Sequence, residues 1–508
     1  MTKAKRAKQP KAPKPRLPRG LQDIDSKPFT QQINMVSQLA SLCEAHGFCA
    51  LDTPALEYAD VLGKFLPDAE RPNEGVFALL DDDEQWLSLR YDLTAPLARY
   101  VAAHYDQLPK PFRRYQWGWV WRNEKPGLGR FRQFMQFDVD TVGASGAQAD
   151  VEMCMLAADF MEALGIARGD YLLRVNNRKI LDGILLSLGL DPDDAAYEMR
   201  RLTILRAMDK LDRLGMDAIR LLLGAGRKDE SGDFTEGAGL GAAAIDKIVD
   251  FLQTDDKDRQ AVLNRLGTHA QDKGKGAELV KIGLHELALM DELLTQLGYG
   301  AERVLFDPSI VRGLDYYTGP VFEMSLNMSS AKSQTGDAAR VGAIGGGGRY
   351  DGLVARFKGV AIPATGISIG INRLMAAREA MGAMTEAEQE AGKARLVVVL
   401  VMDKTRLGDM LALVQQLRKA GIQAELYMGD GGMKAQLRYA DIKGAALALI
   451  EGEDELAKGV ITIKDLALGR QKAAEIADNA EWRASQHAQQ QVKKEALIAM
   501  IQQKLQIN

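Results

Sequence analysis

The sequence contains few of the residues from which disulfide frameworks and metal sites are built. Its 508 residues include only three cysteines, Cys43, Cys49 and Cys154, and only five histidines. The cysteines lack the spacing of metal ligands, and the histidines are scattered along the chain. We therefore expect reduced, structural thiols of the kind found in the cytoplasm, and no metal site built from histidine. The sequence assigns no residue as a metal ligand.

Long apolar runs are also absent. No stretch approaches the roughly 20 apolar residues that cross a bilayer, and the charged N-terminal segment lacks the apolar core of a secretory signal. We expect no membrane association. An apolar content of 46% and a charged content of 26% are ordinary for a soluble globular protein. A length of 508 residues predicts more than one domain.

Neither sign of charge dominates the chain, whose formal net charge is −4. This value predicts no general attraction to nucleic acid, although a local basic segment can still bind phosphates. The first 16 residues carry seven lysines and arginines, no acid, and prolines at positions 10, 13 and 15. Such a composition cannot bury a core, so we predict a disordered basic arm over residues 1–18.

Residues 119–140, WVWRNEKPGLGRFRQFMQFDVD, alternate apolar and polar residues on both sides of a Pro-Gly sequence. The alternation predicts two half-buried strands, and KPGLG predicts the turn of a hairpin. Arginine pairs well with phosphate oxygens, and ordered carboxylates can hold an amine. The charged side chains of the hairpin therefore indicate a binding site for a nucleoside triphosphate and an amine-bearing substrate. An exposed, charge-laced hairpin is the alternative. The charged side chains concerned are Arg122, Arg130, Arg132, Glu124, Asp138 and Asp140.

In the rest of the chain, the spacing of apolar residues distinguishes helical segments from segments in which strands and helices alternate. Residues 191–298 are almost wholly helical in pattern, which predicts a helical domain inserted into a larger α+β domain. A polar linker follows at residues 384–394. From residue 395 strands and helices alternate, which predicts a compact α/β domain with a mainly parallel sheet. A final helical pattern covers residues 492–505.

The hairpin also resembles motif 2 of the class II aminoacyl-tRNA synthetases. Arg122 and Glu124 fill its R-x-E pattern, and Arg130, Phe134 and Asp138 fill R-x-x-x-F-x-x-x-D.

Further segments narrow the resemblance to the histidyl-tRNA synthetase family. Residues 310–323, IVRGLDYYTGPVFE, and 344–354, IGGGGRYDGLV, resemble that family's two signature peptides. Residues 89–100, LRYDLTAPLARY, resemble its amino-acid-binding segment. Residues 366–374, GISIGINRL, resemble class II motif 3, and DTPALE around Pro54 resembles the end of motif 1.

The resemblance implies an α+β fold, with the antiparallel sheet of a class II synthetase, flanking helices, a helical insertion and a C-terminal α/β anticodon-binding domain. The implied divisions are a basic arm (1–18), the first part of the catalytic domain (19–169), a helical insertion (170–298), the second part of the catalytic domain (299–383), a linker (384–394) and the anticodon-binding domain (395–508).

The resemblance also implies how ATP would be held. Arg122 would hold the α-phosphate and Glu124 the adenine amino group. Phe134 would stack on adenine, while Arg130 and Arg373 would grip the outer phosphates. A structural ion pair is the alternative for each arginine.

The family pattern further implies which residues would recognise histidine. Asp92 and Thr94 match the pair that binds the α-ammonium group, and Gln136 matches a residue that reaches the amino-acid backbone. Asp140 and Tyr317 match positions that address the imidazole ring. The implied histidine pocket comprises Asp92, Thr94, Gln136, Asp140, Arg312, Tyr316 and Tyr317. Arg312 would lie beside the α-phosphate and the substrate carboxylate, and Arg122, Arg312 and Arg373 would be catalytic.

The glycine run at residues 345–348 permits close backbone approach to a ligand or a bend in a strand. It lacks the lysine and hydroxyl residue of a phosphate-binding P-loop. With the family match, the glycines are expected to floor the histidine pocket, and Tyr350 to contribute to its wall.

Two positions depart from the family pattern. Asn372 stands where an acid usually precedes the motif 3 arginine, which puts metal or ribose contacts there in doubt. The loop at residues 125–129 is short and offers one charged side chain to the acceptor end of tRNA.

The implied activity is ligation of histidine to tRNA(His) through a histidyl-adenylate, with ATP as substrate, Mg²⁺ as cofactor, and AMP and pyrophosphate as products. A cytoplasmic homodimer built around motif 1 near Pro54 is expected, and the basic arm either gathers tRNA or only solubilises the chain. A synthetase-like regulatory subunit of ATP phosphoribosyltransferase and an inactive tRNA-binding module are alternatives, but neither explains the complete set of arginines.

Overall fold

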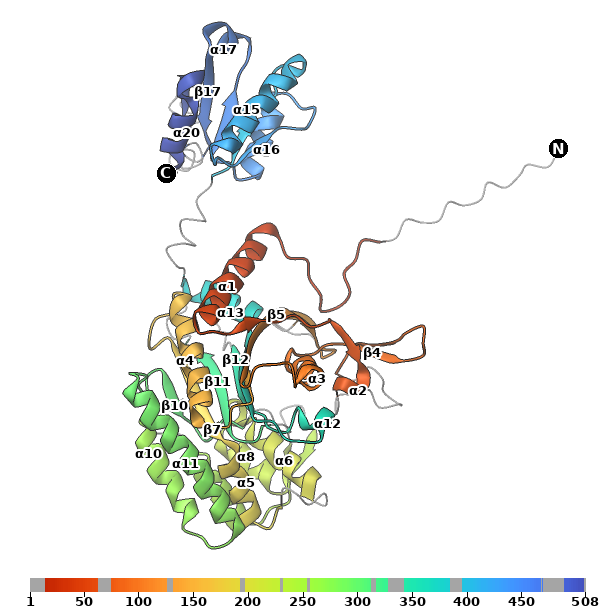
Figure 1. Cartoon of the computed structure of the whole chain (residues 1–508), viewed down its shortest axis with the longest axis vertical. Helices are drawn as coiled ribbons and strands as arrows, with labels where there is room; N and C mark the ends of the chain where they lie inside the picture. Colours follow the sequence, from red (N-terminus) through yellow and green to blue (C-terminus); the bar gives the residue numbers. More distant parts are fainter. Residues whose placement is uncertain are drawn as a thin grey trace, which may run out of the picture. The chain divides into compact units, whose positions relative to one another are not determined.

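The computed structural model describes residues 14–62, 75–125, 131–191, 197–228, 232–253, 256–311, 317–327, 342–383, 395–466, 468 and 488–506. The chain forms two compact units, Met1–Met384 and Thr385–Asn508. Each unit has its own sheet and its own apolar core. Figure 1 follows the chain through both units. In the described part of the chain, no helix has the length and apolarity needed to cross a membrane.

An eight-stranded sheet forms the centre of the first unit. The six inner strands pair antiparallel, and only the two outer pairs, β1–β5 and β7–β10, are parallel. The predicted antiparallel sheet is therefore confirmed. In spatial order the strands are β1 (Cys49–Ala50), β5 (Phe112–Trp121), β6 (Gln133–Val142), β13 (Ala364–Gly370), β12 (Gly345–Arg349), β11 (Pro320–Leu326), β7 (Tyr171–Asn177) and β10 (Val304–Phe306).

The predicted hairpin is confirmed, because β5 and β6 pair antiparallel from Trp121 and Gln133 to Phe112 and Val142. Its turn lies outside the described residues. The prediction that β6 is half-buried was wrong, since nearly all of this strand is enclosed. On one face of β6 lies an apolar core to which helices α1 (Ser26–Ala45), α4 (Ala147–Ala163) and α13 (Ile371–Met381) contribute. On the other face, the polar side chains of β6 line an internal cavity.

Most of the described residues assigned to the predicted helical insertion are helical, but its predicted start lies in a strand of the central sheet. Its boundary at residue 170 is corrected, because β7 is a strand of the central sheet that pairs with both β11 and β10. The insertion also contains a small hairpin, β8 (Gly226–Lys228) with β9 (Phe234–Glu236). Its helical elements and those that flank it are α5 (Arg178–Ser187), α6 (Glu198–Met208), α7 (Leu211–Leu214), α8 (Met216–Leu223), α9 (Ala242–Phe251), α10 (Arg259–Leu266), η3 (Gly267–Ala270) and α11 (Lys275–Gln296).

Helices α5 and α11 approach each other closely where both carry glycine. A Cβ atom added at Gly183 would lie 2.5 Å from the carbonyl oxygen of Gly276, and a Cβ atom at Gly276 would lie 2.5 Å from that of Gly183. Asn177, which caps α5, also donates to the Glu286 side chain of α11 at 2.7 Å. Helix α11 is thus hydrogen-bonded to the last residue of strand β7.

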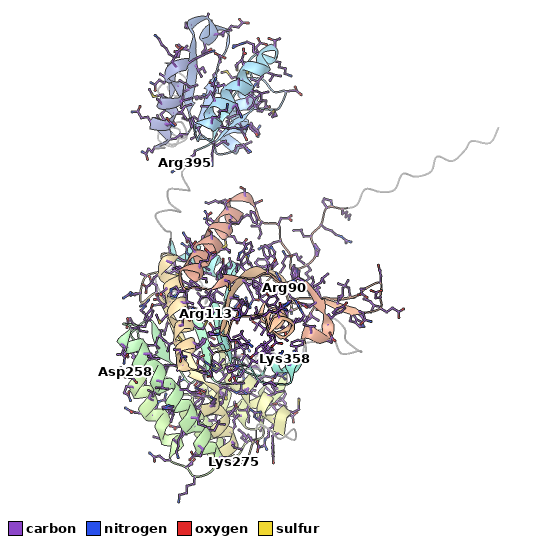
Figure 2. The ribbon with its side chains drawn as sticks, in the orientation of Figure 1. Arg90, Arg113, Asp258, Lys275, Lys358 and Arg395 are labelled. Carbon is purple, nitrogen blue, oxygen red and sulfur yellow. The ribbon has the colours of Figure 1, made fainter. Side chains whose placement is uncertain are left out.

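A small antiparallel sheet borders the central one and consists of β2 (Leu56–Tyr58), β4 (Trp86–Leu89) and β3 (Ala78–Leu80). Arg90, labelled in Figure 2, follows β4 and donates hydrogen bonds to the carbonyl oxygens of Thr53 and Trp119. It therefore ties the segment before β2 to strand β5. Three short or flanking helices complete the region: α2 (Ala59–Leu62), α3 (Thr94–His104) and α12 (Ala355–Lys358).

The second unit contains a five-stranded sheet whose order is β15–β14–β16–β17–β18. The predicted mainly parallel sheet is corrected, because β17 and β18 pair antiparallel. The predicted last helix is also shorter, since Val492 lies in β18 and the helix begins at Leu497. The elements are β14 (Val397–Val399), η5 (Lys404–Arg406), α15 (Leu407–Lys419), β15 (Ala424–Leu426), α16 (Met433–Ile442), β16 (Leu447–Ile450), α17 (Glu453–Lys458), β17 (Val460–Asp465), β18 (Gln489–Lys493), η6 (Lys494–Ala496) and α20 (Leu497–Leu505).

Candidate functional site

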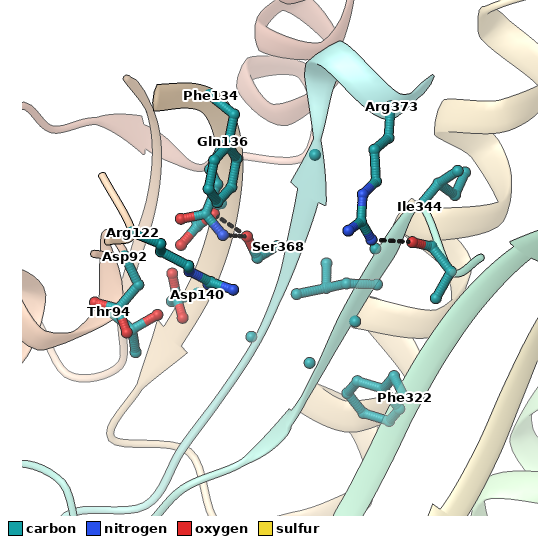
Figure 3. Close-up of a pocket in the computed structure, with 18 of the residues that line it drawn as sticks. Asp92, Thr94, Arg122, Phe134, Gln136, Asp140, Phe322, Ile344, Ser368 and Arg373 are labelled. Atoms are coloured by element: carbon teal, nitrogen blue, oxygen red, sulfur yellow. Dashed lines mark hydrogen bonds between the residues drawn. The ribbon is translucent and has the colours of Figure 1, made fainter. Parts of the chain in front are cut away.

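A cavity of about 740 Å³ lies over the middle of the central sheet (Figure 3). Its wall is formed by strand β6, the start of α3, the glycine strand β12, strand β13 and the start of α13. The cavity therefore joins segments that are up to about 280 residues apart in the chain, from Asp92 to Arg373.

Strand β6 supplies four of the lining side chains because side chains alternate between the faces of a strand. Phe134, Gln136, Asp138 and Asp140 line the cavity. The intervening Met135, Phe137 and Val139 belong to the apolar core below. Packing of one face of β6 thus fixes the direction of the polar groups on the other.

Most of the predicted site residues meet at this cavity. Those that line it are Asp92, Thr94, Arg122, Glu124, Phe134, Gln136, Asp140, Tyr317 and Arg373. The predicted Arg130, Arg312 and Tyr316 lie outside the described residues.

A buried ion pair stands at the base of the cavity. Arg114 of β5 contacts Asp140 of β6, with 2.8 Å between Nη2 and Oδ2, and both side chains are almost fully enclosed. Arg114 also donates to the carbonyl oxygen of Leu93, and the Tyr350 hydroxyl donates to Asp140. Burial raises the pKa of Asp140, while Arg114 and the Tyr350 hydrogen bond oppose that rise. Asp140 is thereby held as an oriented acceptor at the cavity wall.

A second acid, Asp138, lies two residues away on the same strand. It accepts a hydrogen bond from the Ser368 hydroxyl of β13, and Ser368 accepts one from Gln136 at 2.8 Å. Burial is the main cause that raises the pKa of Asp138 to about 7; Arg114 lowers it and the neighbouring Asp140 raises it further. The carboxyl therefore titrates within the physiological range.

The arginines of the cavity are oriented by the main chain. Arg122 donates through Nε to the carbonyl oxygen of Tyr91 at 3.2 Å, and its guanidinium carbon lies 5.2 Å from the centre of the Phe134 ring. Arg373 donates to the carbonyl oxygen of Ala343 at 3.1 Å. Burial raises the pKa of Asp92, and Arg122 is among the groups that oppose it. Cationic groups therefore face the cavity beside a carboxylate and an aromatic ring.

The glycines of β12 and β13 are required by close backbone packing. A Cβ atom at Gly347 would lie 2.0 Å from the carbonyl oxygen of Gly366. At Gly366 it would lie 2.0 Å from Oδ1 of Asp140. Since real Cβ atoms do not approach so closely, these positions exclude larger residues and leave bare backbone as the cavity floor.

Asn372, the departure from the family pattern, lines the cavity and has a structural hydrogen bond. Its Oδ1 atom accepts from the backbone N–H of Met135 at 2.7 Å. This contact joins the first turn of α13 to β6 and holds the neighbouring Arg373 in register with the cavity. An asparagine oxygen serves this purpose as well as a carboxylate would.

Several residues of the site escaped prediction from sequence, among them Arg114, Ser368 and Asp209. Arg114 and Ser368 act through partners on neighbouring strands, and only the strand order reveals those partners. Asp209, which follows α6, also lines the cavity, so the insertion reaches the site. Arg114 carried a detectable signal, as an arginine within the apolar strand pattern FRRYQW. Among the residues the structure describes, no group of three or more histidines, cysteines or acids could hold a metal ion.

Comparison with known proteins places these features in a family. Residues 20–374 match the model described as "Histidyl-tRNA synthetase", and residues 396–504 match "Anticodon binding domain". The chain is 51% identical over 497 residues to a histidine–tRNA ligase of Rhizobium leguminosarum, covering 98% of this chain and 96% of that one. It is 52% identical over 491 residues to a histidine–tRNA ligase of Rhizobium meliloti, with 96% and 95% covered. The solved structure of a histidyl-tRNA synthetase from Nostoc is 28% identical, with a TM-score of 0.71 over 97% of this chain and 100% of that one.

The close packing at Gly347 predicts that Gly347→Ala will lower both stability and activity. The added methyl group must displace backbone of β13, a change that typically costs about 1–3 kcal/mol. Thermal unfolding and enzymatic assay would be compared with those of Gly352→Ala, where an added Cβ meets no atom within 4 Å. Equal unfolding temperatures for the two variants would contradict the packing argument.

The raised pKa of Asp138 predicts a carboxyl group that stays protonated well above the usual range for aspartate. Because the folded-state pKa is raised to about 7, the proton is retained at lower pH and is lost as the pH rises through that value. Infrared difference spectra between wild type and Asp138→Asn, recorded from about pH 5 to about pH 9, should show a protonated-carboxyl band that disappears near neutrality. The exposed Asp83→Asn serves as control, and the absence of the band at every pH would contradict the assignment.

Proposed function

The chain belongs to the histidyl-tRNA synthetase family, and from this membership we propose that its cavity activates histidine with ATP and passes the histidyl group to tRNA(His). The substrate carboxylate attacks the α-phosphate, which forms histidyl-adenylate and releases pyrophosphate. Transfer to tRNA then releases AMP. The observation that carries this assignment is the meeting of cationic, aromatic and acidic groups in one cavity. Negative charge accumulates on phosphate oxygens during the first step, so oriented arginines are the groups that this reaction requires.

Arg122 is proposed to hold the α-phosphate, with Phe134 stacked on adenine and Glu124 bound to the adenine amino group. The main-chain hydrogen bond of Arg122 supports this role, since it fixes the guanidinium beside Phe134. Arg373 is proposed to bind the outer phosphates. Arg130 and Arg312 keep the corresponding roles implied by the family pattern.

Histidine is proposed to bind with its α-ammonium group at Asp92 and Thr94, with its amino-acid backbone reached by Gln136, and with its imidazole ring at Asp140 and Tyr317. A buried polar pocket discriminates well, because a side chain without ring nitrogens leaves its acceptors unpaired. The cationic partner of Asp140 supports the role, since Arg114 orients that carboxylate toward the cavity wall. Tyr316 and Arg312 are proposed to complete the pocket.

Mg²⁺ is proposed to accompany ATP. Mg²⁺ is commonly held by substrate phosphates together with one or two carboxylates, and not by a complete protein cage. The second unit is proposed to bind the anticodon of tRNA(His), which its family match supports, and the enzyme to act in the cytoplasm.

A homodimer is proposed from an exposed apolar face on the small sheet. Tyr58, Leu87 and Leu79 are opposite one another on its three strands, so their side chains share a face. Tyr58 and Leu79 are 53% and 45% exposed, and Leu56 on the same face is 41% exposed. Contiguous exposed apolar side chains mark association surfaces.

Sedimentation equilibrium tests this dimer. Wild type should sediment at twice the chain mass, and Leu79→Lys should dissociate it, because the lysine charge would be buried against the partner. Met199→Lys is the matched control, since Met199 is an exposed apolar residue elsewhere on the same unit. A monomeric wild type would contradict the proposal.

Histidine-dependent ATP–pyrophosphate exchange tests the activity itself. Wild type should exchange with histidine and with no other amino acid. Arg122→Ala and Arg312→Ala should each lose about 10²- to 10³-fold in kcat, since each removes a positioned cation.

The exposed Arg206→Ala is the matched arginine control and should retain full exchange. No histidine-dependent exchange from folded wild type, in the presence of ATP and Mg²⁺, would reject the proposed function.

A further inference from the structure

The side-chain amide of Gln136 could face Ser368 with either its nitrogen or its oxygen, and at the cavity wall it is held with the nitrogen toward Ser368. Its Nε2 atom donates to the Ser368 hydroxyl at 2.8 Å, as Figure 3 shows, and that hydroxyl donates to Oδ1 of Asp138 at 2.5 Å. Gln136 is only 8% exposed, and its Oε1 atom has no hydrogen-bond partner among the described residues. The chain of hydrogen bonds thus runs from the amide through the hydroxyl to the carboxylate.

The chemistry of these three groups dictates the direction of that chain. Above about pH 7 the Asp138 carboxyl is ionised and only accepts, so the single hydroxyl proton of Ser368 goes to Asp138. The Ser368 oxygen can then only accept from Gln136, which requires the amide nitrogen, and not its oxygen, to face Ser368. An amide at a site without such a constraint can present either end. Asp138 and Ser368 therefore select the carbonyl oxygen of Gln136 as the atom left for a ligand.

A buried carbonyl oxygen without a partner requires a hydrogen-bond donor. Gln136 lines the cavity together with Asp92 and Thr94, and Figure 3 shows the three on the same side. An ammonium group carries three N–H donors and no acceptor. The oxygens on this side of the cavity match that pattern, whereas an amide presented through its NH₂ group would oppose it.

We propose that Asp138 and Ser368 are positioning residues that hold the Gln136 amide with its oxygen toward the α-ammonium group of the amino-acid substrate. This inference rests on the proposed function, the activation of histidine. The buried Asp138 carboxylate acts on Gln136 through two hydrogen bonds, with Ser368 between them. It thereby decides whether Gln136 presents its oxygen, which attracts the ammonium group, or its NH₂ group, which repels it.

The test compares histidine with 3-(imidazol-4-yl)propionate, which lacks the ammonium group but keeps the ring and the carboxylate. Binding of both ligands is measured for wild type, Ser368→Ala and Asp138→Asn, at about pH 8.5, where the Asp138 carboxyl is ionised. The asparagine amide can donate to Ser368 as well as accept from it, so the direction of the hydrogen-bond chain is no longer fixed and the Gln136 amide can turn its NH₂ group toward the ligand. Histidine KM and kcat are measured alongside by pyrophosphate exchange.

Both variants should weaken histidine binding and raise its KM about 10- to 100-fold, the usual effect of losing a hydrogen bond to a charged group. The affinity for imidazolylpropionate and the kcat for exchange should change by less than about threefold. Ser368→Thr restores the hydroxyl and should restore histidine affinity. Ser325→Ala is the matched control, because Ser325 is a half-buried serine on strand β11 of the same sheet whose hydroxyl donates to the carbonyl oxygen of Leu172.

Equal losses for the two ligands, or no loss for either, would overturn the positioning role. So would a failure of Ser368→Thr to recover histidine affinity while Ser368→Ala remains folded. The binding measurement distinguishes failure of the positioning role from failure of the proposed function. A wild type that binds histidine without exchanging pyrophosphate contradicts the activity alone, and the variants still decide the role of Asp138 and Ser368.

Discussion

The ion pair between Arg114 and Asp140 is the contact on which the site depends. The two residues are directly opposite each other on β5 and β6, and both are removed from solvent. Burying two charges is costly unless each has further hydrogen bonds, and here Leu93 and Tyr350 supply them. These partners lie in the turn before α3 and in the segment after β12. One interaction thus draws together the hairpin, the turn before α3 and the glycine strand, and removal of one partner from such a pair typically costs about 3–5 kcal/mol.

The central strand β6 extends this constraint along the cavity. Met135, Phe137 and Val139 are locked into the apolar core beneath the sheet, where Phe137 packs edge-on against Phe160 of α4, with 5.9 Å between the ring centres. The cavity-facing residues of β6 are therefore presented on a rigid support. Ser368 of β13 orients Gln136, and Asn372 of α13 holds the strand itself through the backbone N–H of Met135. A site built on strands holds its side chains more accurately than one built on loops. The acceptors that line the cavity therefore have their direction set by the protein itself.

Sequence patterns predicted the hairpin through its local alternation, and the contiguous motifs of the family resemblance implied the antiparallel sheet and most of the residues that line the cavity. They did not predict that Ser368 would meet Gln136 and Asp138, since that contact joins residues more than 200 positions apart through the pairing of β6 with β13. The assignment of residues 171–177 to the insertion failed for a related reason, because their pairing with β10 and β11 is non-local. In the second unit, strand direction also depends on the connections and not on the strand sequences, so the antiparallel β17 and β18 were missed.

The most direct measurement is a crystal structure of the protein bound to histidine and a non-hydrolysable ATP analogue. We expect the imidazole ring against Asp140 beside its ion pair with Arg114, the α-ammonium group within hydrogen-bonding distance of Oε1 of Gln136, and the α-phosphate at Arg122. Histidine bound in the reverse direction, with its ammonium group at Asp140, or bound outside the cavity over β6, would contradict this binding mode.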